Sequence, residues 1–248
     1  MQAIDCLVVW LGRVPYSQAL DLQMRICDAK KQGFVKDILL LLEHDPTITI
    51  GRSGKPNHLL ANEDTLKSRG IEFWHVDRGG DITYHGPGQL VGYPLLLLGS
   101  RERDVHAYMR NLEESLIRLL ARFGIDSSRD PRYTGVWTPR GKIAAMGVHI
   151  SRWITRHGFA LNVNTDLSFY DLIVPCGITG KSVTSMQKQL ARDLDLAEVA
   201  DQYVREFGSV FSRSMIRVDG PTLGDELRYH GERIQAAVEP GTSGAPAV

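Results

Sequence analysis

Two periodicities of apolar residues divide the chain. Short runs of consecutive apolar residues are typical of buried β-strands, and apolar residues that recur every three or four positions are typical of helices with one buried face. The helical spacing predicts helices at 16–27, 104–123 and 196–207. The apolar runs predict strands at 6–11, 37–43, 47–50, 71–76, 136–137, 142–150 and 158–164, with one more strand between a glycine-rich loop at 78–89 and the second helix.

The order of these elements predicts an α/β fold of the α+β type. Some neighbouring strands are separated only by a turn, such as the one at Asp45-Pro46, whereas others are separated by a helix. Turns join antiparallel strands and crossovers join parallel ones, so we expect a mixed sheet. Asp104 is a suitable N-cap for the second helix, and Gly124 and Gly33 are suitable residues to end the second and first helices.

The chain is expected to form one domain over residues 1–234. Its 248 residues suffice for a large α/β domain, and folding at this length buries roughly 70–75% of the surface of the unfolded chain. No linker and no internal repeat interrupts this part. After Ile234 the sequence has no periodicity and is rich in Gly, Pro and Ala, so we expect residues 235–248 to be a disordered tail.

Charge and composition narrow the class of function. The chain has 29 Lys and Arg against 29 Asp and Glu, a net charge of 0, which removes the electrostatic case for binding nucleic acid or an anionic membrane. Its longest apolar stretches, 38–42 and 90–98, are far shorter than the roughly 20 residues of a membrane-spanning helix. The N-terminus lacks the basic segment of a secretory signal. We therefore expect a soluble, cytoplasmic protein without nucleic-acid or membrane partners.

The sequence predicts no disulfide framework and no cofactor. Cys6, Cys27 and Cys176 form no CxxC pair and cannot all pair, which fits a reducing compartment. The eight histidines lack the spacings of a zinc site. The GITGKS segment at 177–182 is not a phosphate-binding loop, because Pro175 stands where the first glycine is required.

A loop and a lysine are the first candidates for chemistry. The loop 78–89 (RGGDITYHGPGQ) contains five Gly or Pro residues, so its backbone could approach a ligand closely; a turn-rich connection explains the same composition. Lys142 opens an apolar strand of small residues. If it faces inward, its partly desolvated ammonium is chemically useful, although an edge lysine that reaches water is the commoner case.

Cys176 is the third candidate. It lies between Pro175 and Gly177, on a tight turn where a substrate could reach the sulfur, although a lone loop cysteine is more often incidental. Cys27 falls on the core face of a predicted helix and Cys6 begins a strand, so both are expected to be inert core residues.

Four segments in this order resemble one enzyme family. They are RGGDITYHGPGQ at 78–89, GKIAAMGVHIS at 141–151, HGFALNVNTDL at 157–167 and IVPCGI at 173–178. Together they resemble the octanoyltransferases of lipoate biosynthesis, the lipoyl(octanoyl) transferases. The resemblance implies the fold of the biotin/lipoate-protein ligase group, in which helices flank a mixed sheet and a second, smaller sheet is present.

The resemblance also implies a reaction and its partners. An octanoyl group passes from octanoyl-acyl carrier protein to a cysteine thioester, and then to a specific lysine of a lipoyl domain. The acceptors are the lipoyl domains of 2-oxoacid dehydrogenases and the glycine-cleavage H protein. By resemblance Cys176 is the nucleophile, and Lys142 lowers the pKa of its thiol and serves as acid and base. The implied substrate-binding residues are Arg78, Gly79, Gly80, Asp81, Ile82, Thr83, Tyr84, His85, Ala145, Met146, Gly147, Gly158, Phe159 and Ala160.

Three alternatives stay open at this point. An ATP-dependent lipoate- or biotin-protein ligase would share the fold but needs no cysteine in its site. A thiol hydrolase would pair Cys176 with a histidine such as His85 or His149, and would leave Lys142 without a role. A non-catalytic module would use the glycine-rich loop only as a docking surface. Because acyl carrier proteins are acidic, the candidates for docking them are Arg140, Arg152 and Arg156.

Overall fold

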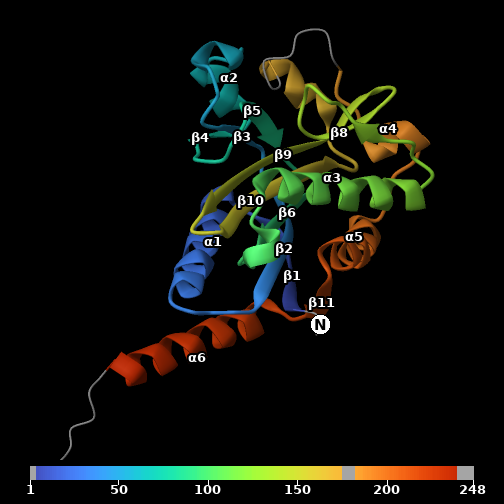
Figure 1. Cartoon of the computed structure of the whole chain (residues 1–248). Helices are drawn as coiled ribbons and strands as arrows, with labels where there is room; N and C mark the ends of the chain where they lie inside the picture. The colour runs from blue at the N-terminus through green and yellow to red at the C-terminus, as the bar shows by residue number, and fades with distance from the viewer. Residues whose placement is uncertain (1–3, 175–181, 239–248) are drawn as a thin grey trace, which may run out of the picture.

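The computed structural model describes residues 4–174 and 182–238 and arranges them around two sheets (Figure 1). Neighbouring strands run parallel in some pairs and antiparallel in others in both sheets, which confirms the expected mixed topology. The smaller sheet has the spatial order β4 (Glu72–His75), β3 (Thr47–Ile50), β5 (Ile82–His85). The larger sheet has the order β11 (Arg213–Arg217), β1 (Ile4–Val14), β2 (Asp37–His44), β6 (Gln89–Leu95), β10 (Ile154–Asn162), β9 (Gly141–Ser151), β8 (Val136–Thr138), β7 (Ser128–Arg129).

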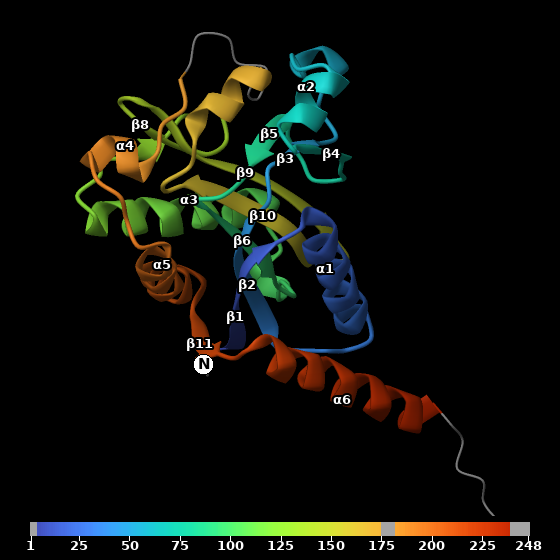
Figure 2. The ribbon, with the colours of Figure 1, turned by 180° about the vertical axis from the view of Figure 1, so that it is seen from behind.

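Helices cover both faces of the larger sheet (Figures 1 and 2). Helices α3 (Val105–Arg122) and α5 (Leu196–Phe211) pack on one face, and α1 (Tyr16–Lys31) and α6 (Gly220–Val238) lie on the other side. Alternate residues of β2 point into the two cores: Leu39 into the first, Leu40 into the second. A strand that is buried on both faces reads as a continuous apolar run, as this one does in the sequence.

The shorter helical elements lie in the connections between the long strands and helices. They are α2 (Glu63–Ser68), α4 (Met186–Leu190) and three 3₁₀ turns, η1 (Pro56–His58), η2 (Ser100–Glu102) and η3 (Leu167–Leu172). Apolar periodicity did not predict α2 and α4, because a helix of one or two turns shows too few repeats of the pattern. The predicted N-cap of α3 is confirmed, since the Asp104 carboxylate accepts the backbone N–H groups of His106 and Ala107.

Two sequence-based expectations differ from the structure. The glycine-rich segment 78–89, expected to be a loop throughout, contains strand β5, whose four residues are all buried and pair with β3. Helix α6 runs to Val238, so residues 235–238 are helical although we expected a disordered tail from 235. Residues 239–248 and Cys176 lie outside the described residues.

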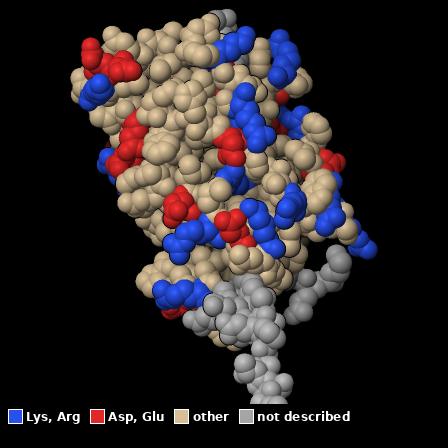
Figure 3. Space-filling model, turned by 90° about the vertical axis from the view of Figure 1, so that its left-hand side faces the viewer, with Lys and Arg blue, Asp and Glu red and all other residues tan. Residues whose placement is uncertain are grey.

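The surface is consistent with the balanced charge of the sequence. Basic and acidic side chains both occur across the face shown in Figure 3, several of them in adjacent pairs. Among the described residues, no helix combines the length and apolar character needed to cross a membrane.

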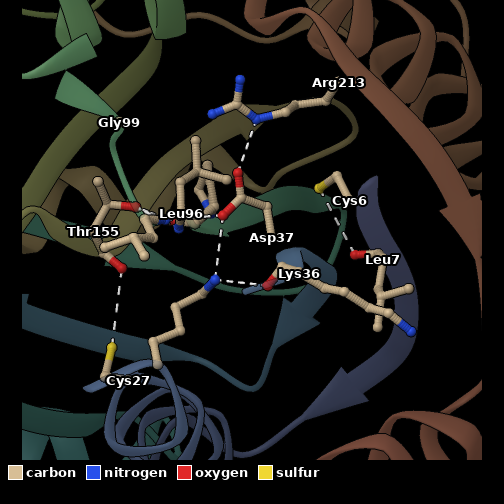
Figure 4. A network of polar contacts seen from close by, with 12 residues as sticks. Cys6, Leu7, Cys27, Lys36, Asp37, Leu96, Gly99, Thr155 and Arg213 are labelled. Atoms are coloured by element: carbon tan, nitrogen blue, oxygen red, sulfur yellow. Dashed lines mark hydrogen bonds and ion pairs between the residues drawn. The ribbon is translucent and has the colours of Figure 1, made fainter. Parts of the chain in front are cut away.

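A buried ion network fastens α1 and β11 to the start of β2 (Figure 4). Asp37 Oδ1 accepts hydrogen bonds from Lys30 Nζ at 3.2 Å and from the Leu97 backbone N–H at 2.9 Å. Asp37 Oδ2 accepts one from Arg213 Nε at 2.8 Å. Burial lowers the pKa of Lys30, and the neighbouring Asp37 carboxylate opposes that change. The network compensates charges that would be costly to bury alone.

Removing Asp37 is therefore expected to be strongly destabilising. Asp37→Ala leaves the Lys30 and Arg213 cations buried without the carboxylate that accepts their hydrogen bonds. We expect the unfolding free energy to fall by roughly 3–5 kcal/mol. Urea denaturation followed by circular dichroism measures this loss. The matched control is Asp45→Ala, which breaks an exposed pair with Arg13 and should cost less than about 1 kcal/mol. Equal losses for the two variants would contradict a structural role for the network.

Candidate active site

A pocket lies where the smaller sheet meets the β9–β10 hairpin of the larger one. Its walls come from the segment before β5 and β5 itself, from β9 and β10, and from single residues of α1 and β6. Most of the predicted substrate-binding residues meet in this pocket although they lie up to 82 positions apart in sequence (160 − 78). The lining residues are Tyr16, Arg78, Gly80, Asp81, Ile82, Thr83, His85, Tyr93, Ala145, Met146, Gly147, His157, Gly158, Phe159 and Ala160.

Two predicted residues, Gly79 and Tyr84, do not line the pocket. The ring of Tyr84 stacks on Phe169 with 4.7 Å between ring centroids, inside the core of the smaller sheet. Successive side chains of a strand point to opposite faces, so Tyr84 points away from the face to which Thr83 and His85 contribute. Gly79 instead donates its N–H to the carbonyl of Val148 at 2.9 Å, which ties the loop to β9.

The β9–β10 hairpin presents small side chains to the pocket. Ala145 pairs with Ala160, and Gly147 pairs with Gly158, so these four residues share one face of the hairpin. The intervening pair, Met146 and Phe159, belongs to the opposite face, where the Phe159 ring lies 4.6 Å from that of Tyr203 in α5. Phe159, one of the predicted substrate-binding residues, also lines the pocket, while its ring packs in the helix-covered core.

A glycine is required at position 147, where the loop approaches β9 closely. A Cβ at this position would lie 2.5 Å from the Gly79 carbonyl oxygen and 3.1 Å from Arg78 Cδ. Both distances are shorter than ordinary van der Waals contact, so a side chain here would push the loop away from β9. The glycine thus allows the loop to close over the hairpin and form the pocket.

Arg78 holds the loop against the smaller sheet. Its Nη2 donates to the carbonyl oxygen and to Oγ1 of Thr49, both at 2.8 Å, and its Nη1 donates to the Gly79 carbonyl at 3.1 Å. The residue is only 7% exposed. A planar guanidinium with several donors suits such a cluster of acceptors, which fixes its orientation at the pocket wall.

Two tyrosines that line the pocket, Tyr16 and Tyr93, were not predicted from the sequence. His44, which is not a lining residue, joins Tyr93 to β1. Its Nδ1–H donates to the carbonyl of Val14 at 2.9 Å, so its Nε2 accepts a hydrogen bond from the Tyr93 hydroxyl at 2.7 Å. Burial lowers the pKa of His44 to about 4 and raises that of Tyr93 well above its usual value. Both groups are therefore neutral at pH 7. Tyr16 is recognisable in the sequence only as one member of an apolar helical stripe, which is why its role was missed.

His85 is also neutral and fixed in one tautomer. Gln89 Nε2 donates to Asn162 Oδ1, so Gln89 Oε1 accepts the His85 Nδ1–H at 3.0 Å. Burial lowers the pKa of His85 well below its usual value. Its Nε2 lies 3.4 Å from Thr49 Oγ1, the oxygen that also accepts from Arg78. One hydrogen-bonded chain thus connects the wall of the pocket to Arg78.

A cluster around Asp77 holds His157, one of the residues that line the pocket. Asp77 accepts hydrogen bonds from Arg156 and from His157 Nε2, the latter at 2.9 Å, and lies 3.2 Å from His149 Nδ1. His157 has a left-handed backbone, with φ of 58°, and it is adjacent in sequence to Arg156, yet both side chains reach the same carboxylate. Such a conformation is uncommon for a residue other than glycine and is often found at functional sites. The hydrogen bond from His157 lowers the pKa of Asp77.

This cluster corrects one docking candidate. Arg156 is only 8% exposed and engages Asp77, so its guanidinium is not available on the surface to an acidic carrier protein. Arg140 and Arg152 are exposed.

Asp81 and His58 form a second buried pair at the pocket wall. His58 Nδ1–H donates to Asp81 Oδ2 at 2.5 Å, and the exposed fractions of the two side chains are 16% and 10%. The backbone carbonyl of His58 accepts the N–H of Val174 at 2.7 Å. Val174 is the last described residue before the segment 175–181.

Lys142 lies at the opposite boundary of that segment. Its N–H donates to the carbonyl of Ser182, and its carbonyl accepts the N–H of Thr184, both at 2.9 Å. The residue is only 7% exposed, and its Nζ lies over the Trp137 ring at 5.1 Å from the ring centroid. A Cβ on Gly135 would lie 2.5 Å from Lys142 Cε, so a glycine is required beside the stem. Lys142 is thus inward-facing and not an edge lysine.

The two other cysteines are buried, as the sequence predicted. Cys6 and Cys27 lie in the two helix-covered cores, and burial raises the pKa of both thiols. A raised thiol pKa disfavours the reactive thiolate. Neither cysteine lines the pocket.

The buried histidines make stability depend on pH in one direction. His44 has a pKa of about 4 when folded against about 6.5 when unfolded, so between these pH values only the unfolded state takes up the proton. Unfolding free energy should therefore fall by about 3 kcal/mol from this residue as pH drops from 6.5 to 4. Urea denaturation at several pH values measures the slope. His44→Gln should flatten it, and an unchanged slope in that variant would contradict the assignment.

Comparisons with known proteins agree with this geometry. Residues 15–208 match the family model of the lipoyl protein ligase A/B catalytic domain. An octanoyltransferase of Solibacter usitatus is 51% identical over 212 residues, covering 86% of this chain and 96% of the relative. An octanoyltransferase of Koribacter versatilis is 50% identical over 225 residues, covering 89% of each chain.

Solved structures show the same fold at low sequence identity. A bipartite lipoate protein ligase from Thermoplasma acidophilum superposes with a TM-score of 0.72 at 20% identity, covering 99% of this chain and 100% of that one. Lipoate-protein ligase A bound with ATP superposes with a TM-score of 0.66 at 18% identity, covering 94% and 95%. This chain is thus a member of the lipoyl protein ligase A/B catalytic domain family, and within that family it groups with the octanoyltransferases.

Proposed function

We propose that this protein transfers an octanoyl group from octanoyl-acyl carrier protein to a lysine of a lipoyl domain, through a thioester on Cys176. The observation that carries the proposal is the position of Lys142: a buried ammonium on the strand that supplies Ala145 and Gly147 to the pocket, joined by backbone hydrogen bonds to the chain that follows residue 181. Identity of about half to proteins named octanoyltransferase supports the acyl group. The acceptors would be lipoyl domains of 2-oxoacid dehydrogenases and of the glycine-cleavage H protein.

The dimensions of the site suit this substrate. Ala145 is three residues beyond Lys142 on β9, about 10 Å along the strand. That span is comparable with the extended length of an eight-carbon chain. An acyl group whose thioester lies near Lys142 would therefore place its tail between the small residues of β9 and β10, where burial of methylene groups stabilises the complex by about 0.8 kcal/mol each.

The first half-reaction forms the acyl-enzyme. The Cys176 thiolate attacks the carbonyl carbon of the donor thioester, the new C–S bond forms, and the bond to the carrier sulfur breaks. The carrier thiolate leaves and takes up a proton. The ammonium of Lys142 favours the thiolate of the nucleophile because opposite charges attract more strongly in a partly desolvated site. Exchange between two thioesters is nearly balanced in free energy, so a thiol is a suitable carrier of the acyl group.

The second half-reaction transfers the acyl group to nitrogen. The acceptor amine attacks the octanoyl carbonyl, a C–N bond forms, and the bond to Cys176 sulfur breaks. The product is an octanoyl amide, and the thiol is restored by a proton. Lys142 can supply a proton to the leaving sulfur and regain one later, since lysine can exchange its proton whereas arginine cannot.

An ATP-dependent ligase is the second candidate, favoured by the superposition on lipoate-protein ligase A bound with ATP. The two functions differ in the acyl donor that they use. Incubation with free octanoate, ATP and an apo lipoyl domain forms product only with a ligase, whereas octanoyl-acyl carrier protein forms product only with a transferase.

Mass spectrometry of the protein after exposure to octanoyl-acyl carrier protein tests the proposal. We expect one octanoyl group, bound to Cys176, and none in Cys176→Ala. The matched control is Cys27→Ala, which removes a buried thiol from a core and should reduce stability yet retain acylation. A folded Cys27→Ala variant that fails to acylate, or wild-type protein without an adduct, would refute the assignment of Cys176.

Substitution of Lys142 separates its charge from its proton. Lys142→Ala should slow acylation and raise the pH at which Cys176 is alkylated, because the thiolate loses its cationic neighbour. Lys142→Arg keeps the charge but cannot donate its proton, so it should accumulate octanoyl-enzyme that transfers poorly to the lipoyl domain. Rapid-quench mass spectrometry of both steps measures this. Normal alkylation and turnover in Lys142→Ala would remove the residue from the mechanism.

A further inference from the structure

The pocket wall contains a buried carboxylate that the acyl-enzyme chemistry above does not use. Asp81 is the one acidic residue among the described residues that line the pocket. His58 donates to its Oδ2, whereas its Oδ1 is buried and accepts no hydrogen bond from any residue in the described part of the chain. Burying a carboxylate oxygen without a donor is costly, so this atom calls for a partner that arrives with the substrate.

The pair is joined to the chain that immediately precedes residues 175–181. His58 binds the N–H of Val174 through its carbonyl, and Leu59 and Ile173 form an antiparallel bridge next to it. Cys176 follows Val174 by two positions in the sequence. The chain that leads to the nucleophile is thus fastened to the same residue that orients Asp81.

We propose that Asp81, oriented by His58, binds the ammonium of the acceptor lysine and accepts a proton from its nitrogen during acyl transfer; this rests on the acyl-enzyme proposed above. The acceptor must bring a cation into a pocket that already holds Arg78, beside the strand that carries Lys142, and like charges oppose its entry. A buried carboxylate offsets this repulsion and forms a charge-assisted hydrogen bond with the ammonium. The neutral polar groups that also line the pocket, His85 and Tyr93, cannot compensate the charge.

The proton balance assigns one proton to Asp81. The bound ammonium first loses one proton to solvent and becomes an amine. Its nitrogen attacks the octanoyl carbonyl and becomes positively charged and strongly acidic, so the Asp81 carboxylate can accept its proton. The C–S bond then breaks, and the sulfur takes a proton from Lys142. The proton on Asp81 passes through solvent to Lys142, which restores both side chains. The net change converts thioester and ammonium into amide, thiol and one released proton.

Separate measurement of the two half-reactions tests the proposal. Asp81→Asn keeps the shape of the side chain and removes its charge. It should acylate on Cys176 at the wild-type rate with octanoyl-acyl carrier protein, and its octanoyl-enzyme should transfer to a lipoyl domain about 100-fold more slowly. Asp81→Glu should recover part of the transfer. The control is Asp171→Asn, an exposed carboxylate on η3, which should match wild type in both steps.

A small nucleophile distinguishes this role from a structural one. Hydroxylamine is largely uncharged at neutral pH and needs neither a carboxylate for binding nor the loss of a first proton. It should release the octanoyl group from Asp81→Asn as fast as from wild type. Equal slowing with hydroxylamine and with the lipoyl domain would mean that Asp81 shapes the acyl-enzyme itself, and would overturn the proposal.

The remaining outcomes are also decisive. Loss of both half-reactions in Asp81→Asn and in Asp81→Glu would assign the residue a structural role, and normal transfer in Asp81→Asn would assign it none; either overturns the proposal. Wild-type protein that never becomes acylated would instead overturn the proposed function and this inference together. The acylation step therefore tells the two failures apart.

Discussion

The pocket depends on one buried side chain, Arg78, which fastens the smaller sheet to the larger one. Its guanidinium donates to Thr49 on β3, and the adjacent Gly79 donates to Val148 on β9. Gly147 makes this junction possible because a side chain there would collide with the Gly79 carbonyl. The loop, the smaller sheet and the hairpin thus enclose a space only while these contacts hold.

Satisfied polar groups keep that space suited to an alkyl chain. His44, His85 and Tyr93 are buried, neutral and hydrogen-bonded to protein partners, so they present ring surface and not charge. Charged side chains near that space lie at particular places: the Arg78 guanidinium at the junction, Asp77 beside Arg156, and Asp81 beside His58. An apolar pocket with a few placed polar groups is the usual design of a small-molecule site.

The architecture by itself does not distinguish a ligase from a transferase. Lipoate protein ligases superpose on this chain at 20% identity or less, although the chain is about half identical to octanoyltransferases, because the layers depend on apolar packing that many sequences can supply. The residues that the proposed chemistry uses lie outside that packing. Lys142 bonds to Ser182, and His58, the partner of Asp81, bonds to Val174, so both are fastened to the ends of the segment between these residues.

The sequence by itself determined helices α1, α3 and α5, most strands and most of the segments that form the pocket, because apolar periodicity and motif order are local properties. It did not indicate helix α6 or strands β7 and β11. Only the tertiary structure decided which faces the predicted strands present. It placed the Phe159 ring in the helix-covered core. It also made a strand, β5, of part of the glycine-rich segment by pairing it with β3. It also brought Tyr16, Tyr93 and His157 to the pocket from separate elements. Such contacts depend on strand register and sheet order, which link residues far apart in the chain and leave no local pattern.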